Sequence, residues 1–115
     1  MTTTIYHNPK CSKSRQTLEL LKARGIEPTI VEYLKTPPSI AELKQLLSQL
    51  GLEPRALMRT KEAPYKELDL GSADKSPDVL IRAMHENPVL IERPIVVSGD
   101  KAALGRPPEA VLEIL

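Results

Sequence analysis

Short stretches rich in β-branched and aromatic residues alternate along this chain with longer stretches of helical spacing. The former are typical of strands, because such side chains pack well on a pleated surface. Strands are predicted over residues 3–6, 29–33, 94–98 and 102–104. Gly99 and Asp100 separate the last two, and such a turn predicts a β-hairpin. The strands therefore fall into two groups, one near each end of the chain.

The stretches between the strands carry apolar residues three and four positions apart, the period of an amphipathic helix. One helix is predicted from about Ser12 to Gly25, a residue suited to the left-handed position after a helix. The clearest helix begins where Ser39 and Glu42 have the spacing of a capping box. Further helices are predicted within 54–87, including one that starts at Ser76 and Pro77, and from Pro107 onward.

The order of these elements predicts the fold class. A β-α-β unit, a helical block and a final β-β-α unit form the thioredoxin-like α/β arrangement. Its four-stranded sheet is mixed, because the first unit is parallel and the hairpin antiparallel. We expect one domain over residues 1–115, with the helical block inserted at about 37–90. In such a layout ligands gather beyond the carboxyl ends of the parallel strands.

Composition narrows the class of protein. With 115 residues, 41% hydrophobic and 27% charged, the chain has the balance of a soluble domain with one core. Sixteen basic and fifteen acidic residues give a net charge of +1, which argues against a nucleic-acid or membrane surface. Residues 1–4 lack the basic start and apolar run of a signal peptide, so we expect a cytoplasmic protein.

Cys11 is the only cysteine and follows the first predicted strand, just where the first helix begins. Unpaired N–H groups and the macrodipole at a helix N-terminus favour an anion there. Lys10, Lys13 and Arg15 add positive charge nearby. These conditions lower the pKa of a thiol and make it a nucleophile. The alternative is an inert buried cysteine, and polar and cationic neighbours argue against it.

The residues after Cys11 restrict its chemistry. Cys11 to Ser14 resembles a redox Cys-x-x-Cys motif in which serine replaces the second cysteine. A single thiol can form an adduct but cannot resolve it internally, so redox turnover needs an outside thiol. A cysteine-dependent phosphatase also places a thiolate at a helix N-terminus. Its loop has an arginine six positions after the cysteine, whereas Thr17 stands there, which argues against it.

Three arginines stand beside structural breakers or turns, at positions 59, 93 and 106. A guanidinium offers planar donors that suit tetrahedral oxyanions, although each arginine taken singly also fits a solvated surface charge. The Arg93–Pro94 bond follows the pattern of a cis peptide at the start of a thioredoxin-like strand, a point that the sequence leaves open.

The sequence allows two interpretations each for His7 and Ser14. His7 is either a loop residue or a participant at the thiol, and Ser14 is either a first-turn residue of the helix or a catalytic one. His85 lacks a cluster of partners, and Asp69 and Asp74 have no ligand spacing, so no metal site is predicted.

Four segments in this order resemble the glutaredoxin-coupled arsenate reductases, the ArsC-like family. They are Tyr6 to Arg15, Leu57-Met58-Arg59 with Glu62, Glu92 to Val96, and Gly105 to Glu109. The chain ends soon after its last predicted helix, without the C-terminal extension of longer members, so it resembles the shorter branch of that family.

The resemblance implies an activity and a set of roles. Cys11 is then the nucleophile that attacks arsenate, and Arg59, Arg93 and Arg106 hold the oxyanion. His7 and Ser14 lie near the thiolate and help to keep it ionised. Glutathione and glutaredoxin are the implied partners, with glutathione a co-substrate and no cofactor bound.

Two other classes of protein stay open. A thiol-transfer enzyme would act on glutathione mixed disulfides, with arsenate only a side substrate. A non-catalytic module of the same fold would bind RNA polymerase, as regulatory relatives of the family do, but their redox control generally uses a Cys-x-x-Cys motif that this chain lacks.

Overall fold

The computed structural model describes residues 2–115, which divide into two compact units. The first unit joins the two ends of the chain, residues 2–36 and Arg93–Leu115. The second unit is Pro37–Glu92 and contains the stretch that we expected as a helical insertion, 37–90. The organisation of the chain as one domain stays a prediction.

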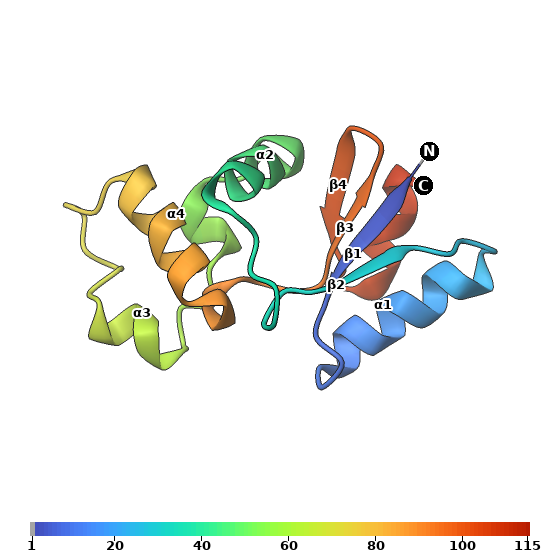
Figure 1. Cartoon of the computed structure of the whole chain (residues 1–115), viewed down its shortest axis with the longest axis horizontal. Helices are drawn as coiled ribbons and strands as arrows, with labels where there is room; N and C mark the ends of the chain where they lie inside the picture. Colours follow the sequence, from blue (N-terminus) through green and yellow to red (C-terminus); the bar gives the residue numbers. More distant parts are fainter. Residues whose placement is uncertain (1) are drawn as a thin grey trace. The chain divides into compact units, whose positions relative to one another are not determined.

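The first unit is built on a four-stranded sheet with the order β2-β1-β3-β4 (Figure 1). Its strands are β1 (Thr3–His7), β2 (Thr29–Glu32), β3 (Ile95–Ser98) and β4 (Lys101–Leu104). β1 pairs in parallel with β2 and antiparallel with β3, and β3 and β4 form the antiparallel hairpin. The predicted mixed sheet is therefore confirmed, and it places the end of β1 beside the end of β2.

Helix α1 (Ser12–Ala23) and the 3-10 helix η3 (Pro108–Ile114) pack against the sheet. The core between them consists of Ile5, Leu21, Val96 and Val111, each fully buried. Burying an aliphatic side chain of this size contributes about 1.5–3 kcal/mol relative to leaving it exposed. This small aliphatic core fixes α1 on β1, and with it the junction at which Cys11 lies. The last predicted helix is therefore present, in the tighter 3-10 form.

The predicted end of the first helix is also confirmed. Arg24 is the C-cap of α1, and Gly25 follows with a φ of 75°. A side chain with a Cβ atom rarely adopts that left-handed conformation, so glycine is suited to this position. The chain then turns into β2 and completes the β-α-β unit.

The second unit consists of helices. They are α2 (Ile40–Leu50), α3 (Ala63–Glu67) and α4 (Pro77–Glu86), with the 3-10 helices η1 (Pro54–Leu57) and η2 (Pro88–Leu90). The capping box is confirmed: Ser39 Oγ accepts from the Glu42 N–H at 3.1 Å, and Glu42 Oε1 accepts from the Ser39 N–H at 3.1 Å. Ser76 caps α4 by accepting from the Val79 N–H at 3.3 Å. Both serine caps therefore start the helices where the sequence places them.

A short antiparallel bridge, which we did not predict, closes the second unit between Met58 and Ile91. The Arg59 N–H donates to the Leu90 carbonyl at 2.7 Å, and the Glu92 N–H donates to the Leu57 carbonyl at 2.7 Å. The bridge therefore places residues 57–59, at the end of η1, beside residues 90–92, at the end of the second unit.

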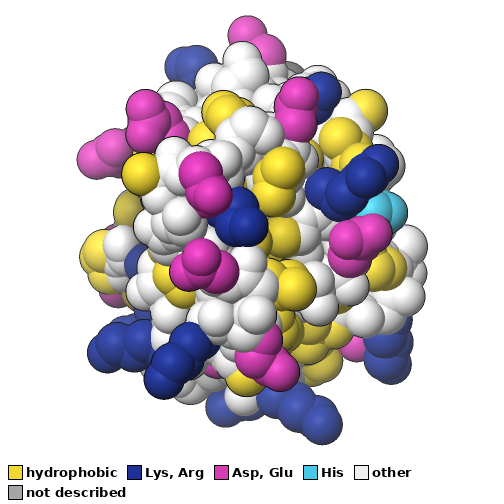
Figure 2. All heavy atoms as spheres, turned by 90° about the vertical axis from the view of Figure 1, so that its left-hand side faces the viewer, with side chains coloured by type: hydrophobic (Ala, Val, Ile, Leu, Met, Phe, Trp, Pro, Cys, Tyr) yellow, Lys and Arg dark blue, Asp and Glu magenta, His cyan; other side chains and the backbone are white. Residues whose placement is uncertain are grey.

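The face of the molecule shown in Figure 2 mixes acidic and basic side chains over much of its area, with a run of apolar side chains passing between them. Among residues 2–115, no helix is long and apolar enough to cross a membrane.

Candidate active site

Cys11 is the N-cap residue of α1, at the end of a tight turn that leaves β1. Its N–H donates to the Asn8 carbonyl at 3.0 Å, and its own carbonyl accepts from the Arg15 N–H at 3.0 Å. The Lys10 N–H donates to Asn8 Oδ1 at 3.0 Å, so the asparagine side chain closes the same turn. The turn therefore presents a partly exposed thiol at the start of the helix.

The surroundings of the sulfur favour the thiolate. Burial raises the pKa of the Cys11 thiol, but the backbone N–H of Ser14, the charge of Arg93 and the backbone N–H of Lys13 outweigh it, so the pKa lies below its ordinary value. Both N–H groups belong to the first turn of α1, where unpaired backbone donors favour an anion. A thiol with these neighbours has the character of a nucleophile.

His7 and Ser14 lie together beneath this turn. His7 ends β1 and Ser14 lies in the first turn of α1, with exposures of 6% and 0%. His7 Nδ1 is 2.6 Å from Ser14 Oγ, and Ser14 Oγ also accepts from the Asn8 N–H at 3.0 Å. The two side chains therefore bond to each other and to the turn, and among residues 2–115 neither makes a hydrogen bond to the sulfur.

The buried position of His7 disfavours the imidazolium. Burial lowers the pKa of His7 most strongly, the carboxylate of Glu32 raises it, and the charges of Arg15 and Lys22 lower it, with a net value below 6.5. Glu32 acts from the neighbouring strand, where it pairs with His7 in the register of β1 and β2. A neutral His7 with its proton on Nε2 would accept a hydrogen bond from the Ser14 hydroxyl.

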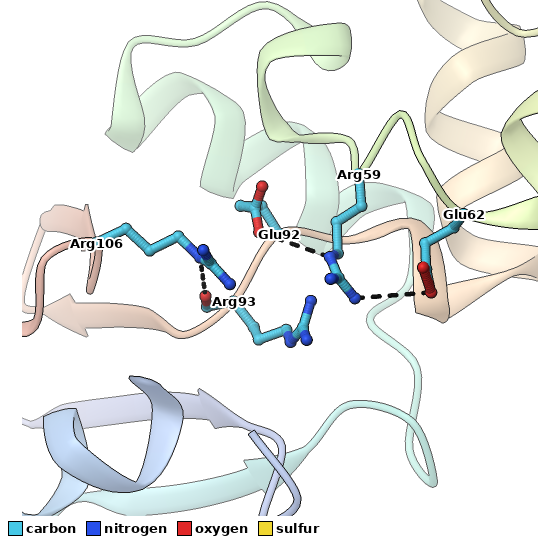
Figure 3. A network of polar contacts seen from close by, with 5 residues as sticks. All are labelled: Arg59, Glu62, Glu92, Arg93 and Arg106. Atoms are coloured by element: carbon cyan, nitrogen blue, oxygen red, sulfur yellow. Dashed lines mark hydrogen bonds and ion pairs between the residues drawn. The ribbon is translucent and has the colours of Figure 1, made fainter. Parts of the chain in front are cut away.

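Arg93 and Arg106 belong to the same unit, before β3 and after β4, and Arg93 lies near enough to Cys11 for its charge to lower the pKa of the thiol. Arg106 Nε donates to the Arg93 carbonyl at 2.9 Å (Figure 3). Nε and Nη1 of Arg93 are buried and have no hydrogen-bond partner among the described residues. Buried donor atoms without an acceptor are costly, so these two atoms are suited to an anion.

Two proline bonds shape this part of the chain. Arg93–Pro94 is cis, which the sequence left open, and Arg106–Pro107 is also cis, which we did not consider. Gly105 precedes Arg106, is buried, and donates its N–H to the Pro94 carbonyl at 2.9 Å. A Cβ atom at Gly105 would lie 2.5 Å from Thr17 Oγ1 and 2.7 Å from Pro94 Cγ. Glycine is therefore required by close approach.

Arg59 belongs to the second unit, where two carboxylates flank it. Its Nη1 lies 3.6 Å from Glu62 Oε1, and its Nε lies 3.8 Å from Glu92 Oε1 (Figure 3). The role of Arg59 at the thiol stays a prediction. Sequence reasoning missed both carboxylate contacts, although Glu62 and Glu92 stand in the segments that carry the resemblance.

The other titratable candidates have structural surroundings. His85 Nδ1 lies 2.7 Å from the Pro38 carbonyl within the second unit. Over residues 2–115, no group of three or more histidine, cysteine, aspartate or glutamate side chains is placed to hold a metal ion.

The sequence of this chain is similar to those of known proteins along nearly its whole length. The model of the ArsC family matches residues 6–114. The chain is 53% identical to the arsenate reductase of Haemophilus influenzae over 116 aligned positions, which cover 100% of both chains. It is 58% identical over 112 residues to the uncharacterized protein YfgD of Escherichia coli, covering 96% of this chain and 94% of that protein.

A solved structure gives the same result for the fold. The arsenate reductase from Vibrio cholerae superposes with a TM-score of 0.98 at 61% sequence identity, covering 100% of this chain and 98% of that one. The fold is the thioredoxin-like α/β arrangement that the order of elements predicted. The chain belongs to the ArsC family.

Proposed function

We propose that this protein is an arsenate reductase in which the Cys11 thiolate is the nucleophile. The observation that carries the proposal is the position of Cys11 at the N-cap of α1, where backbone N–H groups and Arg93 lower its pKa. Membership of the ArsC family and the two arsenate reductases at 53% and 61% identity support the same activity.

The oxyanion would be held by arginines. Arsenate is an anion and is repelled by a thiolate, so positive charge must offset the approach of the two. Arg93 supplies it with buried donors that have no partner among the described residues, and Arg106 is tied to the Arg93 carbonyl. Arg59 enters the proposal on the family resemblance alone. The guanidinium fork matches two oxygens of a tetrahedral anion at once, which orients arsenic toward the sulfur.

The chemistry follows from one thiol and one oxyanion. Cys11 attacks arsenic, an As–S bond forms, and one arsenate hydroxyl leaves as water after protonation. Glutathione then displaces a second hydroxyl, also as water, and places its own sulfur on arsenic. A glutaredoxin thiolate takes the glutathione sulfur as a mixed disulfide, and the electron pair of that As–S bond stays on arsenic. Arsenic is thereby reduced by two electrons, and water releases arsenite and the Cys11 thiol.

His7 and Ser14 support the thiolate indirectly in this proposal. Ser14 contributes its backbone N–H near the sulfur, whereas its hydroxyl bonds to His7 and to the Asn8 N–H. The pair would therefore fix the turn in which the Ser14 N–H faces Cys11. Because the chain has one cysteine, the two further thiols of the reaction must come from outside, which is the reason for glutathione and glutaredoxin in a reducing cytoplasm.

The test is arsenite formation from arsenate with glutathione, glutaredoxin and the purified protein. Cys11→Ser should abolish turnover and leave the far-UV circular dichroism spectrum and the melting temperature close to those of the parent chain. Retained turnover in that variant would refute the assignment of the nucleophile. Omitting glutaredoxin, with glutathione present, should also stop turnover, and undiminished turnover would refute the proposed reductant.

A second assay with the same protein distinguishes arsenate reduction from thiol transfer, which the partly exposed, low-pKa thiol also permits. A glutathione mixed-disulfide substrate replaces arsenate in that assay. Disulfide turnover without arsenite formation would favour thiol transfer and would overturn the arsenate reductase.

A further inference from the structure

The guanidinium of Arg59 is held from two edges by carboxylates. Glu62 approaches Nη1 from three residues further along the chain, and Glu92 approaches Nε from the end of the unit (Figure 3). The bridge at Met58 and Ile91 fixes Arg59 and Glu92 on neighbouring backbone segments. The contact to Glu92 is therefore built into the fold of the second unit and does not depend on local sequence alone.

These carboxylates orient the guanidinium without using up its donors. Both contacts, at 3.6 and 3.8 Å, are longer than a hydrogen bond. Among residues 2–115, the ion pairs of the Arg59 side chain are these two, through Nη1 and Nε. The side chain keeps 30% of its surface exposed. Arg59 therefore stays able to donate to an incoming anion.

The charge of this cluster shows what Arg59 can contribute. One guanidinium and two carboxylates carry a net charge of −1, so the cluster does not attract an anion from a distance. Arg59 must therefore act at short range, through donors that point in a fixed direction. A long side chain loses several rotamers when it is fixed, and two carboxylates that fix it beforehand remove that cost from binding.

We propose that Glu62 and Glu92 are positioning residues for arsenate binding, which hold the Arg59 guanidinium in the orientation in which it binds the oxyanion. This inference rests on the proposed function, in which Arg59 binds arsenate. Two simpler readings of the carboxylates make different predictions. Carboxylates that act only by charge repulsion would weaken anion binding and do nothing else. Carboxylates that form a purely structural salt bridge would affect folding alone.

The experiment compares Glu92→Gln, Glu92→Asp and Glu62→Gln, with Arg59→Gln as the reference and Glu86→Gln as the control. Glu86 is exposed on α4 and lies outside this cluster. Two quantities are measured: the arsenate concentration that half-protects Cys11 from iodoacetamide, and kcat and KM for arsenate reduction. Protection reports binding without any contribution from glutathione or glutaredoxin, and melting temperatures report folding.

Positioning predicts that both Glu92 variants and Glu62→Gln raise the half-protecting concentration and KM about 3- to 10-fold, with kcat changed much less. Aspartate at this position keeps the charge but loses the reach, so a loss in Glu92→Asp separates geometry from charge. Charge repulsion alone predicts tighter arsenate binding in Glu92→Gln and no change in Glu92→Asp. Either that pattern, or loss of melting temperature without loss of binding, would overturn the inference.

The reference variant keeps this inference separate from the proposal on which it rests. If Arg59→Gln leaves arsenate protection and KM unchanged, the assignment of Arg59 in the proposed function is wrong. If Arg59→Gln weakens binding while the three glutamate variants match Glu86→Gln, Arg59 binds arsenate and only the positioning role is wrong.

Discussion

His7 Nδ1 lies 2.6 Å from Ser14 Oγ, which ties the end of β1 to the first turn of α1 on either side of Cys11 in the sequence. Both side chains are buried, and the same hydroxyl also receives the Asn8 N–H. The pair therefore stabilises the turn directly. It affects the thiol only indirectly, by fixing the backbone on which Cys11 lies. Substitutions of Ser14 and His7 should therefore change the stability of the protein in different ways.

Ser14→Ala should lower stability while leaving the Cys11 thiol reactive. The substitution removes a buried hydroxyl and leaves the Asn8 N–H and His7 Nδ1 without that partner, which costs about 1–3 kcal/mol. The Ser14 backbone N–H, which lowers the pKa of Cys11, remains. Urea unfolding measures the first effect, and the pH dependence of iodoacetamide alkylation measures the second.

Ser12→Ala is the matched control, because Ser12 occupies the same turn with an exposed side chain. It should change stability by less than about 0.5 kcal/mol. A marked rise in the pKa of Cys11 in Ser14→Ala would show that the hydroxyl itself stabilises the thiolate, contrary to this interpretation.

His7 should make the protein less stable as the pH falls below 6.5. Its folded-state pKa is lower than the 6.5 of an exposed histidine, chiefly because of burial. The unfolded state therefore binds more protons in the window between the two values, and the free energy of unfolding decreases as the pH falls through it. Well above pH 6.5 the histidine is neutral in both states and this contribution is constant.

Urea unfolding at several pH values between about 5 and 8 measures this dependence. His7→Gln keeps a polar side chain but cannot titrate, so its stability should vary less over the same window. Equal pH dependence in the parent chain and in His7→Gln would show that another group is responsible.

Arg93→Gln should raise the pKa of the Cys11 thiol. The charge of Arg93 is one of the causes that hold this pKa below its ordinary value, and glutamine removes that charge at similar size. Alkylation by iodoacetamide should then be slower at neutral pH, and its pH midpoint should move upward. An unchanged midpoint would mean that the backbone N–H groups alone account for the reactive thiol.

Arg93→Lys tests geometry separately from charge. Lysine keeps one positive charge but loses the planar fork, so arsenate affinity should fall while the thiol stays closer to the parent chain than in Arg93→Gln. KM for arsenate and the alkylation midpoint are measured on the same preparation. Unchanged affinity for arsenate would argue against Arg93 as an oxyanion ligand.

Local signals in the sequence predicted the elements because each depends on a few neighbouring residues. The Ser39 and Glu42 capping box, the Gly25 helix end and the hairpin turn at Gly99 are all present. Patterns of this kind carry their own physical cause, such as a side chain that caps N–H groups or a glycine that tolerates positive φ. The position of Cys11 at the N-cap follows from the same local reasoning.

Contacts between distant segments could not be predicted in this way. The bridge between Met58 and Ile91 pairs two residues outside any regular strand, so no periodicity indicates it. The Glu92 contact to Arg59 depends on that bridge and was missed with it. Gly105 gave no signal either, because its small size matters only once Thr17 and Pro94 are placed against it.

Gly105→Ala should destabilise the protein and disturb the arginines that flank it. The added Cβ would lie 2.5 Å from Thr17 Oγ1 and 2.7 Å from Pro94 Cγ, so the strand end must shift, at a cost of about 1–3 kcal/mol. The shift would lengthen the hydrogen bond between Arg106 Nε and the Arg93 carbonyl, so KM for arsenate should rise as well. Gly71→Ala is the control, because its Cβ would meet only Tyr65 atoms at 3.4 Å or more. Urea unfolding and steady-state kinetics measure both effects, and a Gly105→Ala variant as stable and active as Gly71→Ala would show that the loop yields without cost.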